Sequence, residues 1–143
     1  MTERIMRAFV RAFCNALATC DAPTLSPFID DAVECTMFGP IELFPFFGQR
    51  RCKTEMLTMC NEIAASLKLR SCDEETMLIA NDRCAALLRV TATHPATGRT
   101  LSFRIAHFAE FRDGKLIGLR VLLDSFDAAE QMLGRNIDLS VMA

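Results

Sequence analysis

The residue of this 143-residue chain best suited to chemistry is His107, one of only two histidines. Alternation along "TLSFRIAHFAEF" places it on one strand face with apolar neighbours, namely Phe103, Ile105, Ala109 and Phe111. A neutral imidazole there can donate or accept a proton near neutral pH, and burial lowers its pKa. His107 is therefore a candidate catalytic acid or base, or a hydrogen-bond anchor for a ligand carbonyl. The structural alternative is a core histidine bonded to a backbone group or a water.

The seven cysteines offer a second kind of chemistry, but their spacing argues against it. No two of them form a CxxC pair, and the histidines are too few to complete a metal site. An odd number of scattered thiols in apolar surroundings is typical of buried small residues in a reducing cytoplasm. We therefore expect no metal, no cofactor and a cytoplasmic location. A nucleophilic cysteine would need a nearby base, which the sequence cannot place.

Length and charge restrict the class of protein. The length favours one domain over residues 1–143. A formal net charge of −2 lacks the basic field of nucleic-acid binders, and no apolar run approaches the ~20 residues of a membrane span. Neither nucleic acid nor a membrane is an expected partner. The arginine-rich start could suit a transit peptide, but Ile5, Phe9, Phe13 and Leu17 recur with helical spacing, which favours a core helix.

Helices are expected mainly in the first half of the chain. The apolar spacing predicts helices over residues 3–20 and 51–67, with a short helix over 22–29 that Asp21 can cap. A last helix, "DAAEQMLG", follows near the C-terminus with Asp127 as a possible cap. Asp124, just before it, is expected to bond backbone or to cap rather than to act in chemistry.

Strands are expected to follow the helices. "DDAVECTMFG" carries Val33, Cys35 and Met37 on one parity, as in a half-buried strand. Later strands are expected over 68–76, 76–82, 84–95, 100–111 and 116–126, with an Asp-Gly hairpin turn in "RDGK". Helices followed by antiparallel strands indicate an α+β fold in which a curved sheet packs on helices.

The segment "GPIELFPFFGQRR" contains two glycines and two prolines, which argue against regular structure throughout. Its three phenylalanines argue against a solvated loop. We therefore interpret it as a flap over the core or across a cavity mouth. The basic cluster Arg50, Arg51 and Lys53 follows, and a solvated face is favoured there over an ion pair or an anionic ligand.

Several of these segments, taken in order, resemble a known family. "DDAVECTMFGP", the flap ending "FGQRR", the next helix and "FAEFRDGKLIGLRVLLD" are similar to the nuclear transport factor 2-like superfamily. The closest likeness is to SnoaL-like and ketosteroid-isomerase-like proteins. The resemblance implies a cone-shaped fold, in which a strongly curved, mostly antiparallel sheet wraps around N-terminal helices (a cystatin-like α+β roll). It also implies an internal ligand pocket and a homodimer through the open sheet face.

The resemblance also shows which catalytic groups are missing. Ketosteroid isomerase uses an aspartate base, a tyrosine and a protonated aspartic acid. A gapless register puts the base at Thr36, the tyrosine near Phe13 and the aspartic acid at His107. Hydrolase and cyclase relatives often carry an acid near Val121, which is missing here too. A steroid-isomerase mechanism is therefore rejected, and the cyclase mechanism is not favoured.

Two functions stay open at this point. The first is a pocket protein that takes a small apolar molecule with one polar handle, either as a binder or as a cofactor-free isomerase, dehydratase or hydrolase. His107 would contact the handle, and the expected lining is Thr36, Phe13, Phe38, Phe103, Ile105, Ala109, Val121 and Leu123. The second is a non-catalytic dimeric ligand-binding or scaffold module. For the dimer, the outward residues expected at the interface are Arg89, Thr91, Arg104, Phe108 and Arg120.

Overall fold

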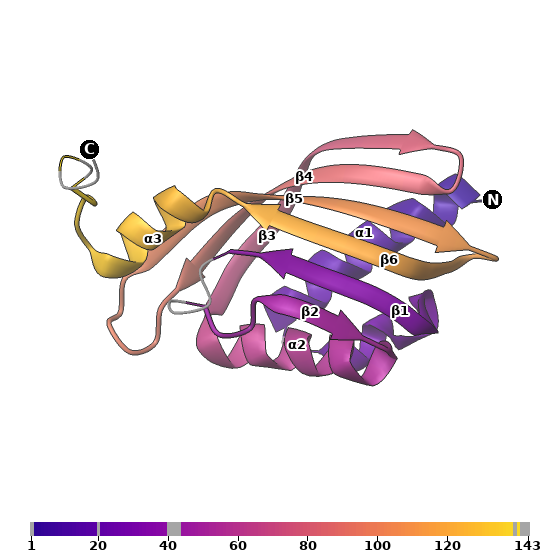
Figure 1. The fold of residues 1–143 in the computed structure, drawn as a ribbon, viewed down its shortest axis with the longest axis horizontal. Helices are drawn as coiled ribbons and strands as arrows, with labels where there is room; N and C mark the ends of the chain where they lie inside the picture. The colour runs from indigo at the N-terminus through magenta and orange to yellow at the C-terminus, as the bar shows by residue number, and fades with distance from the viewer. Residues whose placement is uncertain (1, 20, 40–43, 139, 141–143) are drawn as a thin grey trace.

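The computed structural model describes the whole chain except residues 1, 20, 40–43, 139 and 141–143 (Figure 1). Its helices are α1 (Thr2–Thr19), α2 (Lys53–Ser66) and α3 (Ser125–Leu133), with a 3-10 helix η1 (Ala22–Phe28) after α1. Its strands are β1 (Ile29–Phe38), β2 (Gly48–Arg51), β3 (Lys68–Ala80), β4 (Arg83–Thr93), β5 (Thr100–Arg112) and β6 (Lys115–Leu123).

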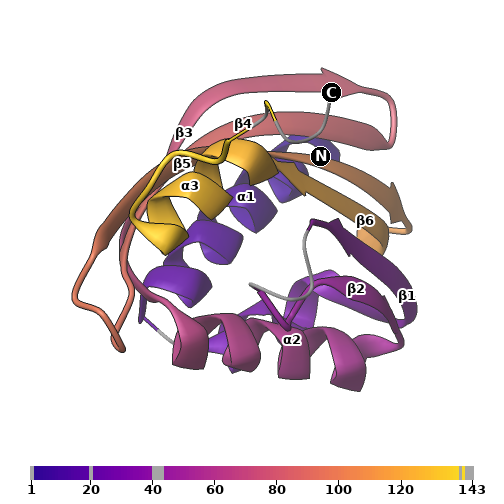
Figure 2. The same cartoon turned by 60° about the vertical axis from the view of Figure 1, so that its left-hand side comes forward.

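The six strands form one mixed sheet in the order β2-β1-β6-β5-β4-β3. Neighbouring strands are antiparallel except β1 and β6, which run parallel. The sheet curves over α1, and α2 runs along the same side (Figures 1 and 2). The α+β architecture expected from the sequence, with a curved and mostly antiparallel sheet around the N-terminal helices, is therefore confirmed.

Helix α1 fills the hollow of the sheet because its apolar residues recur every three or four positions. These residues are all buried in the core: Met6, Phe9, Val10, Phe13, Ala16 and Leu17. The helix packs mainly against β3 and η1. The prediction of a core helix at the N-terminus is confirmed.

The short helix expected over residues 22–29 is a 3-10 helix that ends at Phe28. Pro27 lies inside it and has no backbone N–H to donate, which disfavours a regular α-helix. The predicted cap is wrong, because the Asp21 side chain makes no capping hydrogen bond.

Two strands differ from the sequence-based expectation. The end of the apolar flap is a short strand, β2, which pairs with β1 from Met37–Gly48 to Glu34–Arg51, so helix α2 begins two residues later than expected. The two strands expected over 68–76 and 76–82 are one continuous strand, β3. Irregular pairing with β4 between Leu69 and Ser71 and between Glu74 and Thr76 explains why its alternation looked interrupted.

The hairpin of β5 and β6 has the expected turn. Asp113 and Gly114 adopt positive φ values of 52° and 77°, as a two-residue turn between twisted strands requires. The register with β6 is set by this turn together with an irregularity between Glu110 and Phe111, and it places His107 opposite Val121. On β4, the residue opposite His107 is Ala86. The three residues share the buried face of the sheet.

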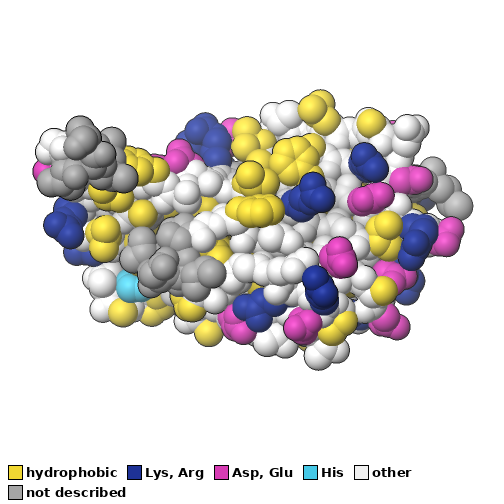
Figure 3. All heavy atoms as spheres, viewed as in Figure 1, with side chains coloured by type: hydrophobic (Ala, Val, Ile, Leu, Met, Phe, Trp, Pro, Cys, Tyr) yellow, Lys and Arg dark blue, Asp and Glu magenta, His cyan; other side chains and the backbone are white. Residues whose placement is uncertain are grey.

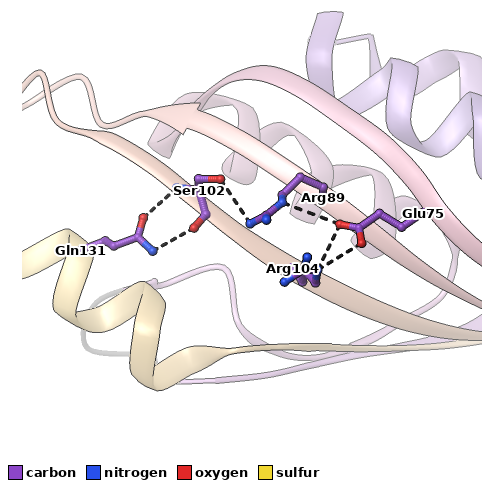
Figure 4. Close-up of polar contacts among 5 residues, drawn as sticks. All are labelled: Glu75, Arg89, Ser102, Arg104 and Gln131. Carbon is purple, nitrogen blue, oxygen red and sulfur yellow. Dashed lines mark hydrogen bonds and ion pairs between the residues drawn. The ribbon is translucent and has the colours of Figure 1, made fainter.

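Helix α3 completes the sheet where β6 stops. β6 ends at Leu123, which pairs with Ile105, so the backbone of Ser102 has no partner on that side. The Gln131 side chain replaces the missing strand: its amide oxygen accepts from Ser102 N at 2.7 Å, and its amide nitrogen donates to Ser102 O at 2.8 Å (Figure 4). Asp124 caps α3 by accepting from Asp127 N, so the structural role expected for Asp124 is confirmed and the Asp127 cap is wrong.

Candidate functional site

His107 lies at the centre of the buried sheet face, and its side chain is fully buried, with 0% exposure. Neither ring nitrogen has a hydrogen-bond partner among the described residues. A buried polar atom without a partner is rare in proteins and costs about 1–3 kcal/mol of stability. Its imidazole is therefore the feature of the core that most needs an explanation.

The imidazole packs against aromatic rings of α1 rather than against polar groups. Its centroid lies 5.4 Å from that of Phe13, in an edge-on arrangement with an interplanar angle of 72°. The Phe9 centroid lies 6.1 Å away. The helical spacing of Phe9 and Phe13 places both rings over the same strand residue.

Burial lowers the pKa of His107 from 6.5 to about 4, because the surroundings disfavour the charged form. The imidazole is therefore neutral at physiological pH, with one nitrogen that donates and one that accepts. A neutral imidazole of this kind can donate a hydrogen bond to a carbonyl, but it is a weak base for abstracting a proton from carbon.

An apolar cavity of about 40 Å³ lies beside this site. It has room for a water or two but is far below the roughly 300–1,000 Å³ of pockets that hold small molecules. Every described residue that lines it is apolar: Phe13, Leu17, Met37, Phe44, Phe46, Phe47, Ile63, Leu67, Leu69, Val90, Phe103, Ile105 and Leu123.

Three phenylalanines of the flap pack together in the wall of this cavity. We call Phe44, Phe46 and Phe47 the phenylalanine plug. All three are buried, and their ring centroids lie 5.1 to 5.8 Å from one another. The Phe47 ring lies where a side chain on Gly39 would be, so residue 39 must be a glycine for this packing. The flap part of the sequence-based prediction is confirmed for these residues, while residues 40–43 lie outside the described part.

Four of the residues expected to line the pocket do line this cavity: Phe13, Phe103, Ile105 and Leu123. Ala109 and Val121 lie on the same buried sheet face as His107 but outside the cavity lining. His107 is not a lining residue either. Phe13 touches both places, since its ring packs on the imidazole and also lines the cavity.

Two expected lining residues, Thr36 and Phe38, lie on the outer face of β1, and this corrects the sequence-based placement. Phe38 is 49% exposed. Side chains alternate along a strand, so the burial of Cys35 and Met37 turns Thr36 and Phe38 outward. The gapless register with ketosteroid isomerase therefore gives the wrong side chain on this strand. Met37 lines the cavity instead.

For the other residues that line the cavity, the sequence predicted burial in the core but no role in a pocket. Leu17, Ile63 and Leu67 follow the helical spacing of α1 and α2, and Leu69 and Val90 lie on buried strand faces. Periodicity marks a residue as buried, but it does not tell a cavity wall from a filled core.

The basic cluster is in part an ion pair. Arg50 Nη2 lies 2.8 Å from Glu62 Oε2 on α2, so the ion-pair alternative holds for this arginine. Within the described ranges, no group of three His, Cys, Asp or Glu side chains is placed to hold a metal ion. No described helix is both long enough and apolar enough to cross a membrane.

Comparison with known families adds to this geometry. The profile of the SnoaL-like domain matches residues 10–118, which is most of the chain. The chain belongs to the SnoaL-like domain family. No curated protein sequence matches this SnoaL-like protein at a significant level.

Solved structures with the same fold carry several different names. A "putative isomerase" from Rhodopseudomonas palustris is 38% identical, with a TM-score of 0.85 over 94% of this chain and 100% of that one. A "putative hydroxylase" from Streptomyces galilaeus is 16% identical, with a TM-score of 0.74 over 96% and 89% of the two chains. A protein with a ketosteroid isomerase-like fold from Catenulispora acidiphila, in complex with trimethylamine, is 8% identical, with a TM-score of 0.76 over 89% and 92%. The last two show the fold alone. Together with the domain match and the 38% identical relative, this fold confirms the resemblance stated from the sequence.

Proposed function

We propose that this SnoaL-like protein binds a small apolar molecule that carries one polar group. The ligand occupies the space beside Phe13 that the phenylalanine plug now fills, and its polar group pairs with His107. The observation that carries the proposal is the fully buried imidazole with two unpartnered nitrogens.

A ligand of this kind would supply a hydrogen-bond partner for the unpaired imidazole of His107. A ligand carbonyl that accepts from a ring N–H replaces an unsatisfied donor with a hydrogen bond in an apolar setting, where such bonds are strong. The Phe13 ring stands between the imidazole and the cavity, so binding requires this ring and the plug to move aside. The apolar lining then favours a hydrocarbon body around the single polar contact.

The geometry favours binding over catalysis. Proton abstraction from carbon needs a base, and the described lining of the cavity contains no carboxylate. A second candidate function is a cofactor-free isomerase in which neutral His107 polarises a substrate carbonyl. The isomerase name of the 38% identical relative favours it, but a base would have to come from a group outside the described lining.

The test compares two ligands of nearly equal shape, acetophenone and ethylbenzene, by titration calorimetry. The wild-type protein is expected to bind the ketone about 10-fold more tightly, as one hydrogen bond in an apolar site allows. His107→Leu is expected to bind both equally. His94→Leu is the matched control, because the His94 side chain contacts the Thr97 hydroxyl at an exposed turn and does not line the cavity, and it should keep the wild-type preference. Equal affinities in the wild-type protein would contradict the proposal.

The outer face of the sheet supports a homodimer. Phe38, Phe108 and Leu122 form an outer patch on β1, β5 and β6, with exposures of 49%, 51% and 42%. Figure 3 shows hydrophobic side chains gathered in the middle of this face. The residues predicted to point outward, such as Arg104, lie on the same face of the sheet. Arg104 pairs there with Glu75, so charges of both signs lie beside the apolar patch (Figure 4).

We propose that a second copy of the chain covers the outer patch. A two-fold interface places the same apolar patch on both sides, and a rim with both signs of charge lets arginines of one copy meet acids of the other. Phe108→Lys is expected to weaken the dimer by about 100-fold or more, since it buries a charge within the apolar patch of each copy. Light scattering across a dilution series measures this. Thr58→Lys adds the same charge on the exposed side of α2 and should leave the dimer intact, whereas a monomeric wild-type protein at micromolar concentration would refute the interface.

A further inference from the structure

Two cysteines meet where α1 crosses β3. The thiol of Cys72 on β3 donates a hydrogen bond to the Cys14 sulfur on α1, and the two sulfur atoms are 3.0 Å apart. Both residues are half-buried, and both are free thiols. They are far apart in sequence, so only the packing of the helix on the sheet brings them together.

The pair lies in a cleft of about 310 Å³ that is separate from the apolar cavity. The cleft is lined by Val10, Arg11, Cys14, Asn15, Ala18, Cys72, Asp73 and Glu74. Arg11, Asp73 and Glu74 are exposed, so a small polar molecule can reach the sulfur atoms from solvent. None of the residues that line the apolar cavity, and not His107 either, lines this cleft.

The two thiols differ in character. The hydrogen bond from Cys72 lowers the pKa of Cys14, against the opposing effects of burial and of Asp73 and Glu74. The same hydrogen bond, together with burial, raises the pKa of Cys72. Cys14 is therefore the thiol that ionises first, and a thiolate is the reactive form of cysteine.

We propose that Cys14 and Cys72 form a peroxide-sensitive site that closes to a disulfide between α1 and β3. The Cys14 thiolate attacks one oxygen of hydrogen peroxide, the O–O bond breaks, and the hydroxide released takes up a proton as water. The Cys72 thiol then attacks the sulfur of the Cys14 sulfenic acid. The S–S bond forms as the S–O bond breaks, the Cys72 proton is lost, and a second water leaves. Two thiols are oxidised and one peroxide is reduced.

The charges of the cleft favour peroxide over larger oxidants. One cation, Arg11, faces two carboxylates, Asp73 and Glu74, so an anionic oxidant such as oxidised glutathione is repelled. Hydrogen peroxide is small and neutral. The contact between the sulfur atoms also leaves little room for a metal ion between them, and no third ligand is placed nearby among the described residues.

Intact mass after peroxide treatment of the reduced full-length chain tests the proposal. The wild-type protein is expected to lose the mass of two hydrogen atoms and to regain it with dithiothreitol. Cys14→Ser and Cys72→Ser are expected to abolish this loss. Cys52→Ser is the matched control, because Cys52 is an exposed thiol away from the cleft, and it should behave as wild type.

A second measurement uses the unmutated chain. The number of thiols that N-ethylmaleimide labels after unfolding is expected to drop by two on oxidation, and the melting temperature is expected to rise. Loss of two hydrogens in either Cys14→Ser or Cys72→Ser at the wild-type rate would overturn the proposal. So would addition of oxygen to the wild-type protein without a cross-link, or equally fast closure with oxidised glutathione.

Discussion

Between pH 6.5 and pH 4, the free energy of unfolding of the wild-type protein is expected to fall by up to about 3 kcal/mol because of His107 alone. In the unfolded chain this histidine has its ordinary pKa of 6.5, whereas burial lowers the pKa in the folded protein to about 4. The interval is 2.5 pH units (6.5 − 4), and each unit corresponds to about 1.4 kcal/mol.

The direction follows from which state binds the proton. Well above pH 6.5 neither state is protonated at His107, so the residue adds no pH dependence there. As the pH falls below 6.5, the unfolded chain takes up a proton that the folded protein refuses, and stability declines. Near pH 4 the folded protein also takes up the proton, and the decline from this residue ends.

Urea denaturation across this pH range measures the effect. The wild-type curve is compared with that of His107→Leu, because acidic groups contribute equally to both and cancel in the difference. At neutral pH, His107→Leu is expected to be more stable than the wild-type protein by about 1–3 kcal/mol, since it removes two unpaired buried nitrogens. Parallel curves for the two proteins, with His94→Leu as the second reference, would show that the imidazole is hydrogen-bonded or solvated.

Phe47→Ala is expected to lower the free energy of unfolding by about 3–5 kcal/mol, as the loss of a buried aromatic ring does in other cores. The ring packs against Phe44 and Phe46. The apolar cavity should grow accordingly and bind benzene, as dry apolar cavities of sufficient size do. Thermal denaturation with and without benzene measures both effects.

Two further variants separate the plug from a general loss of core packing. Gly39→Ala keeps every phenylalanine but displaces the Phe47 ring, since the added methyl group takes its place. The Gly39→Ala protein should therefore bind benzene, as Phe47→Ala does. Phe126→Ala removes a partly exposed ring from α3 and should cost about 1 kcal/mol or less without any benzene binding. A Phe47→Ala protein that gains no benzene binding would show that the flap simply collapses into the space.

The sequence predicted best where local chemistry fixes the register. The Asp-Gly turn aligns β5 with β6, and strict alternation along β5 then places His107 on the buried face, as observed. Helix α1 was equally clear, because its apolar spacing is regular from Ile5 to Leu17. In both cases the signal lies within one element or one hairpin.

Thr36 and Phe38 were placed wrongly because strand β1 was aligned with a relative instead of being read from its own alternation. The parity of Val33, Cys35 and Met37 already turned Thr36 and Phe38 outward, but the gapless register put them in the pocket. The pairing of β1 with β6 is irregular between Ile29 and Glu34, so a gapless carry-over has no physical basis there.

The filled cavity could not be predicted from the sequence. The flap was recognised as apolar and irregular, yet no period fixes which way Phe44, Phe46 and Phe47 point. Whether three rings cover a pocket or occupy it depends on contacts with α2 and the sheet that are distant in sequence. The meeting of Cys14 and Cys72 depends on the same kind of contact.

The parallel pairing of β1 with β6 has a consequence for how the chain folds. β1 ends at Phe38, and its partner begins only at Lys115, after every other strand has been made. Contacts between such distant segments form slowly, because a long loop must close first. During synthesis, β1, whose inner face carries Val33, Cys35 and Met37, therefore keeps one backbone edge unpaired until β6 has been made. Chaperone dependence and aggregation of nascent chains are expected to be most sensitive to substitutions at these early positions.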